Sequence, residues 1–72
     1  MDIEEIKVNM LDLVESLYKY QYSLNKPAYK VCLAGLELLN YDHFKATGKY
    51  YIDKHVILEY HRRQWEIKWK KS

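Results

Sequence analysis

The sequence is poor in the residues that build disulfide frameworks, tight turns and membrane spans. It has one cysteine, one proline and two glycines among 72 residues. A single cysteine excludes an intrachain disulfide, and no apolar run approaches the roughly 20 residues of a membrane-spanning helix. The acidic start MDIEEIK also lacks the basic segment that opens a signal peptide. We therefore expect a cytoplasmic protein that does not bind membranes.

Signatures of catalysis and of cofactor binding are missing as well. The sequence contains no glycine-rich phosphate loop, no G-x-S-x-G, no H-E-x-x-H and no paired cysteines. His55 and Glu59 stand at i, i+4 spacing, but a zinc site needs three or four convergent ligands. We therefore expect ordinary histidines, no bound metal, no cofactor and no enzymatic activity. Cys32 lies in the apolar run VCLAGLELL, where a free thiol behaves as a small core residue.

What the chain does have is the composition of a folded globular protein. Apolar residues make up 49% of it and charged residues 31%, far from the profile of a disordered segment. Residues 1–72 suffice for one small domain, whose single core contributes little net stability. We therefore expect apolar surface in excess of what the domain buries, and stabilisation by a partner or a second copy.

An apolar repeat predicts one long helix over residues 3–24. Seven apolar side chains recur at alternating spacings of three and four: Ile3, Ile6, Met10, Leu13, Leu17, Tyr20 and Leu24. Asp2, followed three residues later by Glu5, is typical of a capping box at the start of this helix. A second apolar stripe beside the first consists of Leu11, Val14, Tyr18 and Tyr22. We expect this second stripe to form an oligomer interface.

The segment NKP, residues 25–27, ends the first helix, because proline disfavours the helical conformation of the residue before it. A second helix is predicted over residues 27–39. Its apolar positions go nearly all round the helix, which indicates a buried central element, and Ala34 with Gly35 would admit a closely packed backbone. Residues 40–52 are predicted to be irregular, with either one helical turn ending at a left-handed Gly48 or a small hairpin at ATGK.

Two periodicities compete in the last segment, residues 53–70. A helix is favoured by Asp53 as an N-cap, by Ile52 and Ile57 at the spacing of a hydrophobic staple, and by i, i+4 charge pairs such as Arg62 with Glu66. The alternation in WEIKW and the many β-branched and aromatic residues favour strands instead. We predict a mainly α fold, a bundle of three helices or of four with a short turn. The alternative is an α+β fold with a β-meander over residues 50–71.

Charge is distributed unevenly along the chain. Residues 1–16 carry five acidic side chains against Lys7, and residues 61–72 carry five basic side chains against Glu66. Either the two segments lie side by side and neutralise each other, or the basic segment faces an anionic partner. The basic segment, HRRQWEIKWKK, holds both tryptophans. Its candidate partner-binding residues are Arg62, Arg63, Trp65, Lys68 and Trp69, because Trp and Arg are frequent interface anchors.

Two hypotheses of function follow from these patterns. The first is a small non-enzymatic protein-binding module, a regulator or inhibitor that occupies a surface of a larger protein, with a homodimer through the first helix as its assembly. The second is a transcriptional regulator that binds nucleic acid weakly through the basic, tryptophan-containing end. Ten lysines against two arginines, with many Tyr, Ile and Asn, is the composition of an AT-rich genome and favours a phage or mobile-element product.

Overall fold

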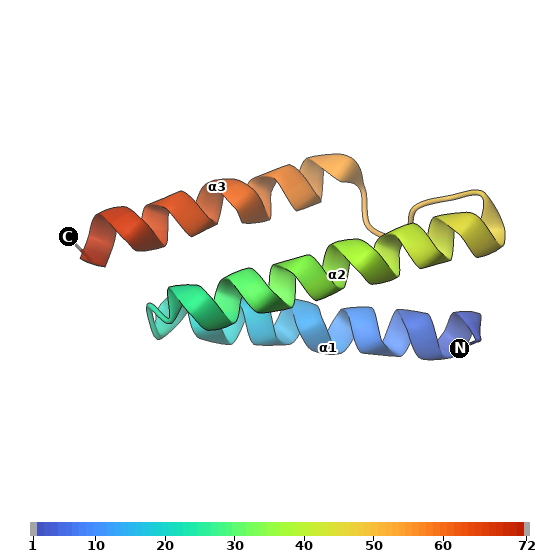
Figure 1. Cartoon of the computed structure of the whole chain (residues 1–72), viewed down its shortest axis with the longest axis horizontal. Helices are drawn as coiled ribbons and strands as arrows, with labels where there is room; N and C mark the ends of the chain where they lie inside the picture. Colours follow the sequence, from blue (N-terminus) through green and yellow to red (C-terminus); the bar gives the residue numbers. More distant parts are fainter. Residues whose placement is uncertain (1, 72) are drawn as a thin grey trace.

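The chain forms three helices joined by two short turns, α1 (Ile3–Tyr22), α2 (Lys26–Thr47) and α3 (Lys54–Lys71). The structure is a computed structural model and describes the backbone of residues 2–71 and the side chains of residues 2–66. Each helix runs antiparallel to the next along the chain (Figure 1). The predicted three-helix, mainly α fold is confirmed. The β-meander is wrong, because α3 is one continuous helix.

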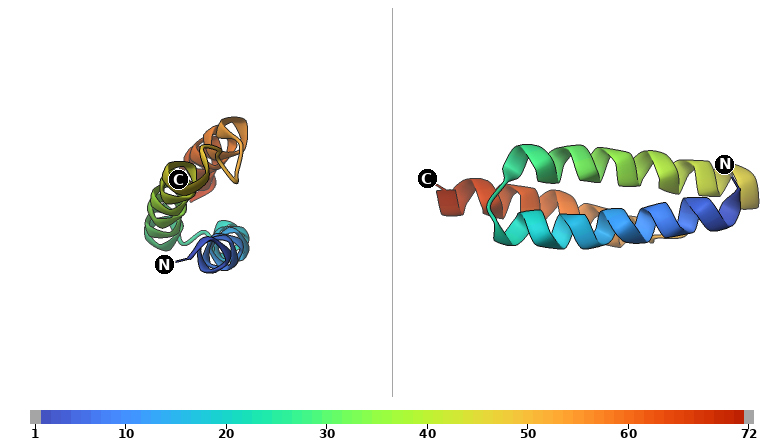
Figure 2. Two further views of the ribbon diagram at one scale, coloured as in Figure 1. Left: turned by 90° about the vertical axis from the view of Figure 1, so that its right-hand side faces the viewer. Right: turned by 90° about the horizontal axis from the view of Figure 1, so that it is seen from below.

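The three helices form an open, layered bundle. The Cα atoms extend 41 × 19 × 13 Å, so the molecule is long and thin. The end-on view shows α2 between α1 and α3, which contact α2 far more than they contact each other (Figure 2). Within the described residues, no helix combines the length and the apolar character that crossing a bilayer requires.

The buried core comes from α1 and α2. Its fully buried apolar side chains are Ile6, Met10, Leu17, Tyr29, Leu33 and Leu36. The predicted apolar stripe of the first helix is confirmed for five of its seven members, since three are buried and Leu13 and Tyr20 pack against them. Its two end members, Ile3 and Leu24, are exposed. Helix α3 contributes no fully buried side chain among residues 54–66 and is held through the half-buried Ile57 and Tyr60.

Both ends of α1 are capped by local hydrogen bonds. The Asp2 carboxylate accepts a hydrogen bond from the Glu5 backbone N–H at 2.8 Å, as the N-terminal capping pattern predicts. The helix stops at Tyr22, short of the predicted residue 24, because the next residues form a Schellman turn. Leu24 is left-handed there, with φ 57°, and the Asn25 N–H donates to the Tyr20 carbonyl at 3.1 Å.

Helix α2 is longer than predicted. It starts at Lys26, where the Asn25 side chain accepts from the Ala28 N–H at 3.2 Å, and it continues through residues 40–47, which we had expected to be irregular. Gly48, with φ 82°, ends it in the predicted left-handed conformation, and the hairpin alternative is wrong. The expectation that α2 is buried all round is also wrong, because Val31 and Leu38 are 72% and 68% exposed.

The small residues of α2 do not receive a neighbouring backbone. Ala34 is exposed, and a Cβ at Gly35 would lie 3.5 Å from a side-chain carbon of Leu13, an ordinary van der Waals distance. The predicted close backbone approach is therefore wrong, and Gly35 packs against a side chain. Cys32 is half-buried against the core, a free thiol that contributes to packing.

Two buried polar side chains of α2 hold the turn before α3. The Asn40 amide donates to the Ile52 carbonyl at 2.9 Å and accepts from the backbone N–H groups of Tyr51 at 3.1 Å and Ile52 at 3.0 Å. The Nδ1 atom of His43 is hydrogen-bonded to the Lys49 carbonyl at 2.7 Å. Asn40 therefore stabilises the turn from inside the helix instead of ending the helix.

The start of α3 follows the sequence pattern. The Asp53 carboxylate accepts from the His55 N–H at 2.8 Å, so Asp53 is an N-cap as predicted. Ile52 and Ile57 both pack against the core, which fixes the angle at which the chain enters the helix.

Candidate protein-binding surface

The described members of the predicted partner-binding set lie on the outer part of α3. Trp65 is 59% exposed, and Leu58, on the same helical face, is 63% exposed. Neither side chain therefore belongs to the core. The side chains of Lys68 and Trp69 lie outside the described residues, although their backbone belongs to α3.

Both arginines of α3 already have partners within the helix. Arg62 donates to the Glu59 carboxylate at 2.7 Å, an i, i+3 pair in place of the expected pair with Glu66. That hydrogen bond raises the pKa of the Arg62 guanidinium. The Arg63 guanidinium lies 5.6 Å from the centre of the Tyr60 ring. These contacts leave the described arginines less available for phosphate groups than the sequence suggested.

The predicted oligomer stripe runs along the solvent side of α1. Leu11, Tyr18 and Tyr22 are exposed, whereas Val14 is half-buried and packs against the core. The rings of Tyr18 and Tyr22 contact each other with centroids 4.8 Å apart, and hydrogen bonding to Tyr22 raises the pKa of the Tyr18 phenol. The stripe is therefore a row of apolar and aromatic side chains that the chain itself leaves uncovered.

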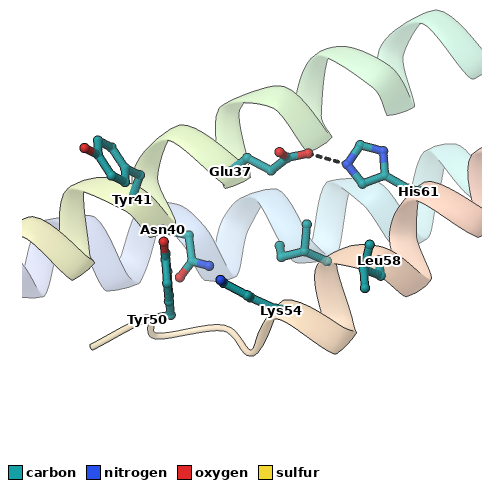
Figure 3. Close-up of a pocket in the computed structure, with 8 residues that line it drawn as sticks. Glu37, Asn40, Tyr41, Tyr50, Lys54, Leu58 and His61 are labelled. Atoms are coloured by element: carbon teal, nitrogen blue, oxygen red, sulfur yellow. Dashed lines mark hydrogen bonds and ion pairs between the residues drawn. The ribbon is translucent and has the colours of Figure 1, made fainter. Parts of the chain in front are cut away.

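A groove lies between α2 and α3. We call it the α2–α3 groove. It has a volume of about 400 Å³ and is lined by Glu37, Asn40, Tyr41, Tyr50, Lys54, Ile57, Leu58 and His61. Figure 3 shows Glu37 and His61 reaching towards each other across it, with Nε2 and Oε1 2.5 Å apart. This contact joins the two walls, and the Asn40 side chain, which also lines the groove, is hydrogen-bonded to the backbone of the turn at residues 51–52.

Lysines lie over two of the aromatic rings that line this groove. Lys45 lies 5.3 Å from the ring centre of Tyr41, and Lys54 lies 5.6 Å from that of Tyr50. Outside the groove lining, Lys26 of α2 lies 5.6 Å from the Trp65 ring of α3. Each contact places an ammonium group beside an aromatic ring.

The α2 side of this surface escaped prediction. Lys26, Lys30, Ala34, Glu37, Tyr41 and Lys45 recur at spacings of four, four, three, four and four along one face. The stripe crosses residue 40, where we expected the helix to have ended, so its second half was assigned to an irregular segment. Recognising that Asn40 can stay inside a helix would have extended the stripe to Lys45.

The acidic and basic segments lie towards opposite ends of the molecule. Figure 1 shows the N-terminus and the C-terminus at opposite ends of the long axis, because α1 and α3 run in the same direction. The neutralising arrangement proposed from the sequence is therefore wrong, and the molecule has an acidic end and a basic end.

The described residues contain no group of three or more His, Cys, Asp or Glu side chains arranged to hold a metal ion. Comparison with known proteins gives no relative: no family model, no curated protein and no solved structure matches the chain. The exposed surface of the three helices is therefore the basis for a proposal of function.

Proposed function

We propose that the chain is a small non-enzymatic protein-binding module that regulates or inhibits a larger protein by occupying one of its surfaces. The observation that supports this most strongly is the ratio of exposed to buried apolar side chains. Among the described side chains, fifteen large apolar ones are exposed and six apolar ones are fully buried. Scattered exposed apolar residues are normal in any protein, but here they recur at helical spacing along α1, α2 and α3.

The surface of the module that meets its partner is the α2–α3 face, with Leu58 and Trp65 as anchors. Large exposed side chains beside a concave groove give a partner both contact area and shape complementarity. We place the module in the cytoplasm as a product of a phage or mobile element, where a host protein is the target. The outer stripe of α1 serves self-association.

The test is affinity capture from lysate of the source cell with the wild-type protein and two matched variants. Leu58→Ser removes an anchor of the α2–α3 face, and Leu38→Ser removes an equally large, similarly exposed side chain from the outer face of α2. We expect wild type and Leu38→Ser to retain the same protein and Leu58→Ser to lose it. Circular dichroism checks that each variant is folded. If wild type retains no protein above the bare-resin control, the proposed function is wrong.

Nucleic-acid binding is a separate outcome of the same experiment. The described arginines are engaged by Glu59 and Tyr60, which favours a protein partner. Titration of labelled duplex and single-stranded DNA at two salt concentrations measures the competing function. Tight, salt-dependent binding of DNA, together with no protein captured, would replace the module with a nucleic-acid-binding regulator.

A further inference from the structure

We propose that the α2–α3 groove binds an acidic amphipathic helix of the partner protein. The inference rests on the proposed function and specifies the chemistry of the bound segment. Its basis is the combination of an interhelical groove, apolar side chains on both walls, one lysine in the lining and three further lysines on the same face of α2.

The shape of the groove selects a helix. Its walls are two antiparallel helices, so the groove runs along their axes, and a third helix is the element that packs lengthwise against such a pair. The stripe from Lys26 to Lys45 extends over about 28 Å at 1.5 Å per residue. A partner helix of about 18 residues covers that length.

The apolar positions of the groove match one face of such a helix. Tyr41 belongs to α2 and Leu58 to α3 (Figure 3). Trp65 follows Leu58 on α3 by seven residues, or two helical turns, and so lies on the same face. Apolar side chains at i, i+3 or i+4, and i+7 of the partner would contact these three, with Ile57 beneath them.

The charges of the groove select acidic flanks. One lysine, Lys54, lines it, and three more, Lys26, Lys30 and Lys45, lie on the same face of α2 as the lining residues Glu37 and Tyr41. Among the described residues, none of the four forms an ion pair, whereas the acidic wall residue Glu37 is paired with His61. Carboxylates flanking the apolar face of the partner would meet these ammonium groups, and a lysine-rich helix would be repelled.

The experiment uses two synthetic peptides of 18 residues with blocked ends and the same apolar positions. In one peptide the flanking residues are Glu, and in the other they are Lys. Binding to the full-length protein is followed by chemical-shift changes of groove amides and by tryptophan fluorescence. We expect the Glu peptide to bind and the Lys peptide to bind at least tenfold more weakly.

Variants of the protein locate the peptide. Lys54→Glu should weaken binding of the Glu peptide at least threefold, and Lys19→Glu, which makes the same charge change on α1, should have a smaller effect. Leu58→Ser should weaken binding at least tenfold, while the matched Leu38→Ser, on the outer face of α2, leaves it unchanged. Equal binding of both peptides, no binding, or binding insensitive to Lys54→Glu and Leu58→Ser would each overturn the inference.

Two further outcomes separate this inference from the proposed function. If the protein forms dimers that Leu58→Ser dissociates, a second copy occupies the groove and the inference is wrong. Lysate capture that survives Leu58→Ser would keep the protein-binding function and reject the groove as its site. If the Glu peptide binds but no partner is captured from lysate, the groove still binds acidic helices and the proposed protein-binding function is wrong.

Discussion

Single polar side chains decide the boundaries of this fold. Asn40 begins the segment, residues 40–52, that the sequence predicts to be irregular. In the structure its amide forms hydrogen bonds with the backbone N–H groups of Tyr51 and Ile52 and with the Ile52 carbonyl, and the helix continues past it. Periodicity and caps were sufficient to predict α1 and the start of α3, because those signals are local. The length of α2 depends on a contact between residues twelve apart, which no local pattern reports.

Replacing Asn40 tests this role. Asn40→Ala leaves two backbone N–H groups and one carbonyl without their partners, and we expect the free energy of unfolding to fall by about 2–3 kcal/mol. Urea unfolding followed by circular dichroism measures the change. Asp42→Ala, at an exposed position two residues away, should change stability by no more than about 0.5 kcal/mol. Similar losses in the two variants would show that Asn40 does not anchor the turn.

Leu24 is the second residue with a testable conformational cost. Its φ of 57° is left-handed, a conformation that costs a side-chain-bearing residue about 1–2 kcal/mol and costs glycine almost nothing. We expect Leu24→Gly to raise the free energy of unfolding by about 0.5 kcal/mol, since greater freedom of the unfolded chain offsets part of the relief. Chemical denaturation compares it with Ser23→Gly. The neighbouring Ser23 is right-handed, with φ −81°, so its replacement should lower stability. A loss in both variants contradicts the expected relief of strain.

Among the elements, α3 is the least firmly attached. No side chain of residues 54–66 is fully buried. The contacts of the helix with α2 include the Lys26–Trp65 cation–π contact and two hydrogen bonds. One is the His61–Glu37 pair, and the other is the Tyr29 hydroxyl, which donates to the Tyr60 carbonyl at 2.8 Å. The helix is weakly amphipathic, because its described apolar side chains fall on two nearly opposite faces, with Val56 and Tyr60 on one and Leu58 and Trp65 on the other. One cluster faces the core through Tyr60, and the other, with Leu58 and Trp65, faces solvent.

The contact of Tyr29 predicts a specific pH dependence. Burial raises the pKa of Tyr29 from 10.0 to about 12, so the folded state disfavours the ionised phenol. The stabilisation from neutral Tyr29 is complete below pH 10 and is lost as the pH rises towards about 12. Tyr29→Phe should be about 1 kcal/mol less stable at neutral pH because the hydrogen bond is missing. Its stability should also decline less than that of wild type across the alkaline window, measured by urea unfolding at several pH values. Parallel declines would assign the alkaline loss to other groups.

At the scale of the whole molecule, the open layer explains why apolar side chains remain exposed on every helix. A thickness of 13 Å between outer Cα atoms leaves no interior in which a third row of side chains could be enclosed. The sequence predicted the excess of apolar surface from chain length and composition. It did not predict where that surface lies, because the placement depends on which faces α2 presents to α1 and α3.

The outer stripe of α1 predicts self-association independently of the α2–α3 groove. We expect size-exclusion chromatography with light scattering to detect a concentration-dependent dimer. In an antiparallel pairing the acidic first turns of one α1 would lie beside Lys19 of the other. Tyr18→Lys should weaken the dimer at least tenfold, because it places like charges at the centre of the contact. Leu38→Lys, on the outer face of α2, should leave it intact. A wild-type protein that stays monomeric at the highest concentration would exclude this interface.

The opposite placement of the two described chain ends constrains how such a domain combines with others. Joining the ends directly would require a linker to cross up to 41 Å, about twelve extended residues. Circular permutation and insertion into a loop of a host protein are therefore costly for this architecture, whereas serial fusion is straightforward. In a tandem array each domain would begin where the previous one ends, so the α2–α3 grooves would repeat at regular intervals along the array. A domain of this shape is therefore suited to tandem duplication and poorly suited to insertion within another domain.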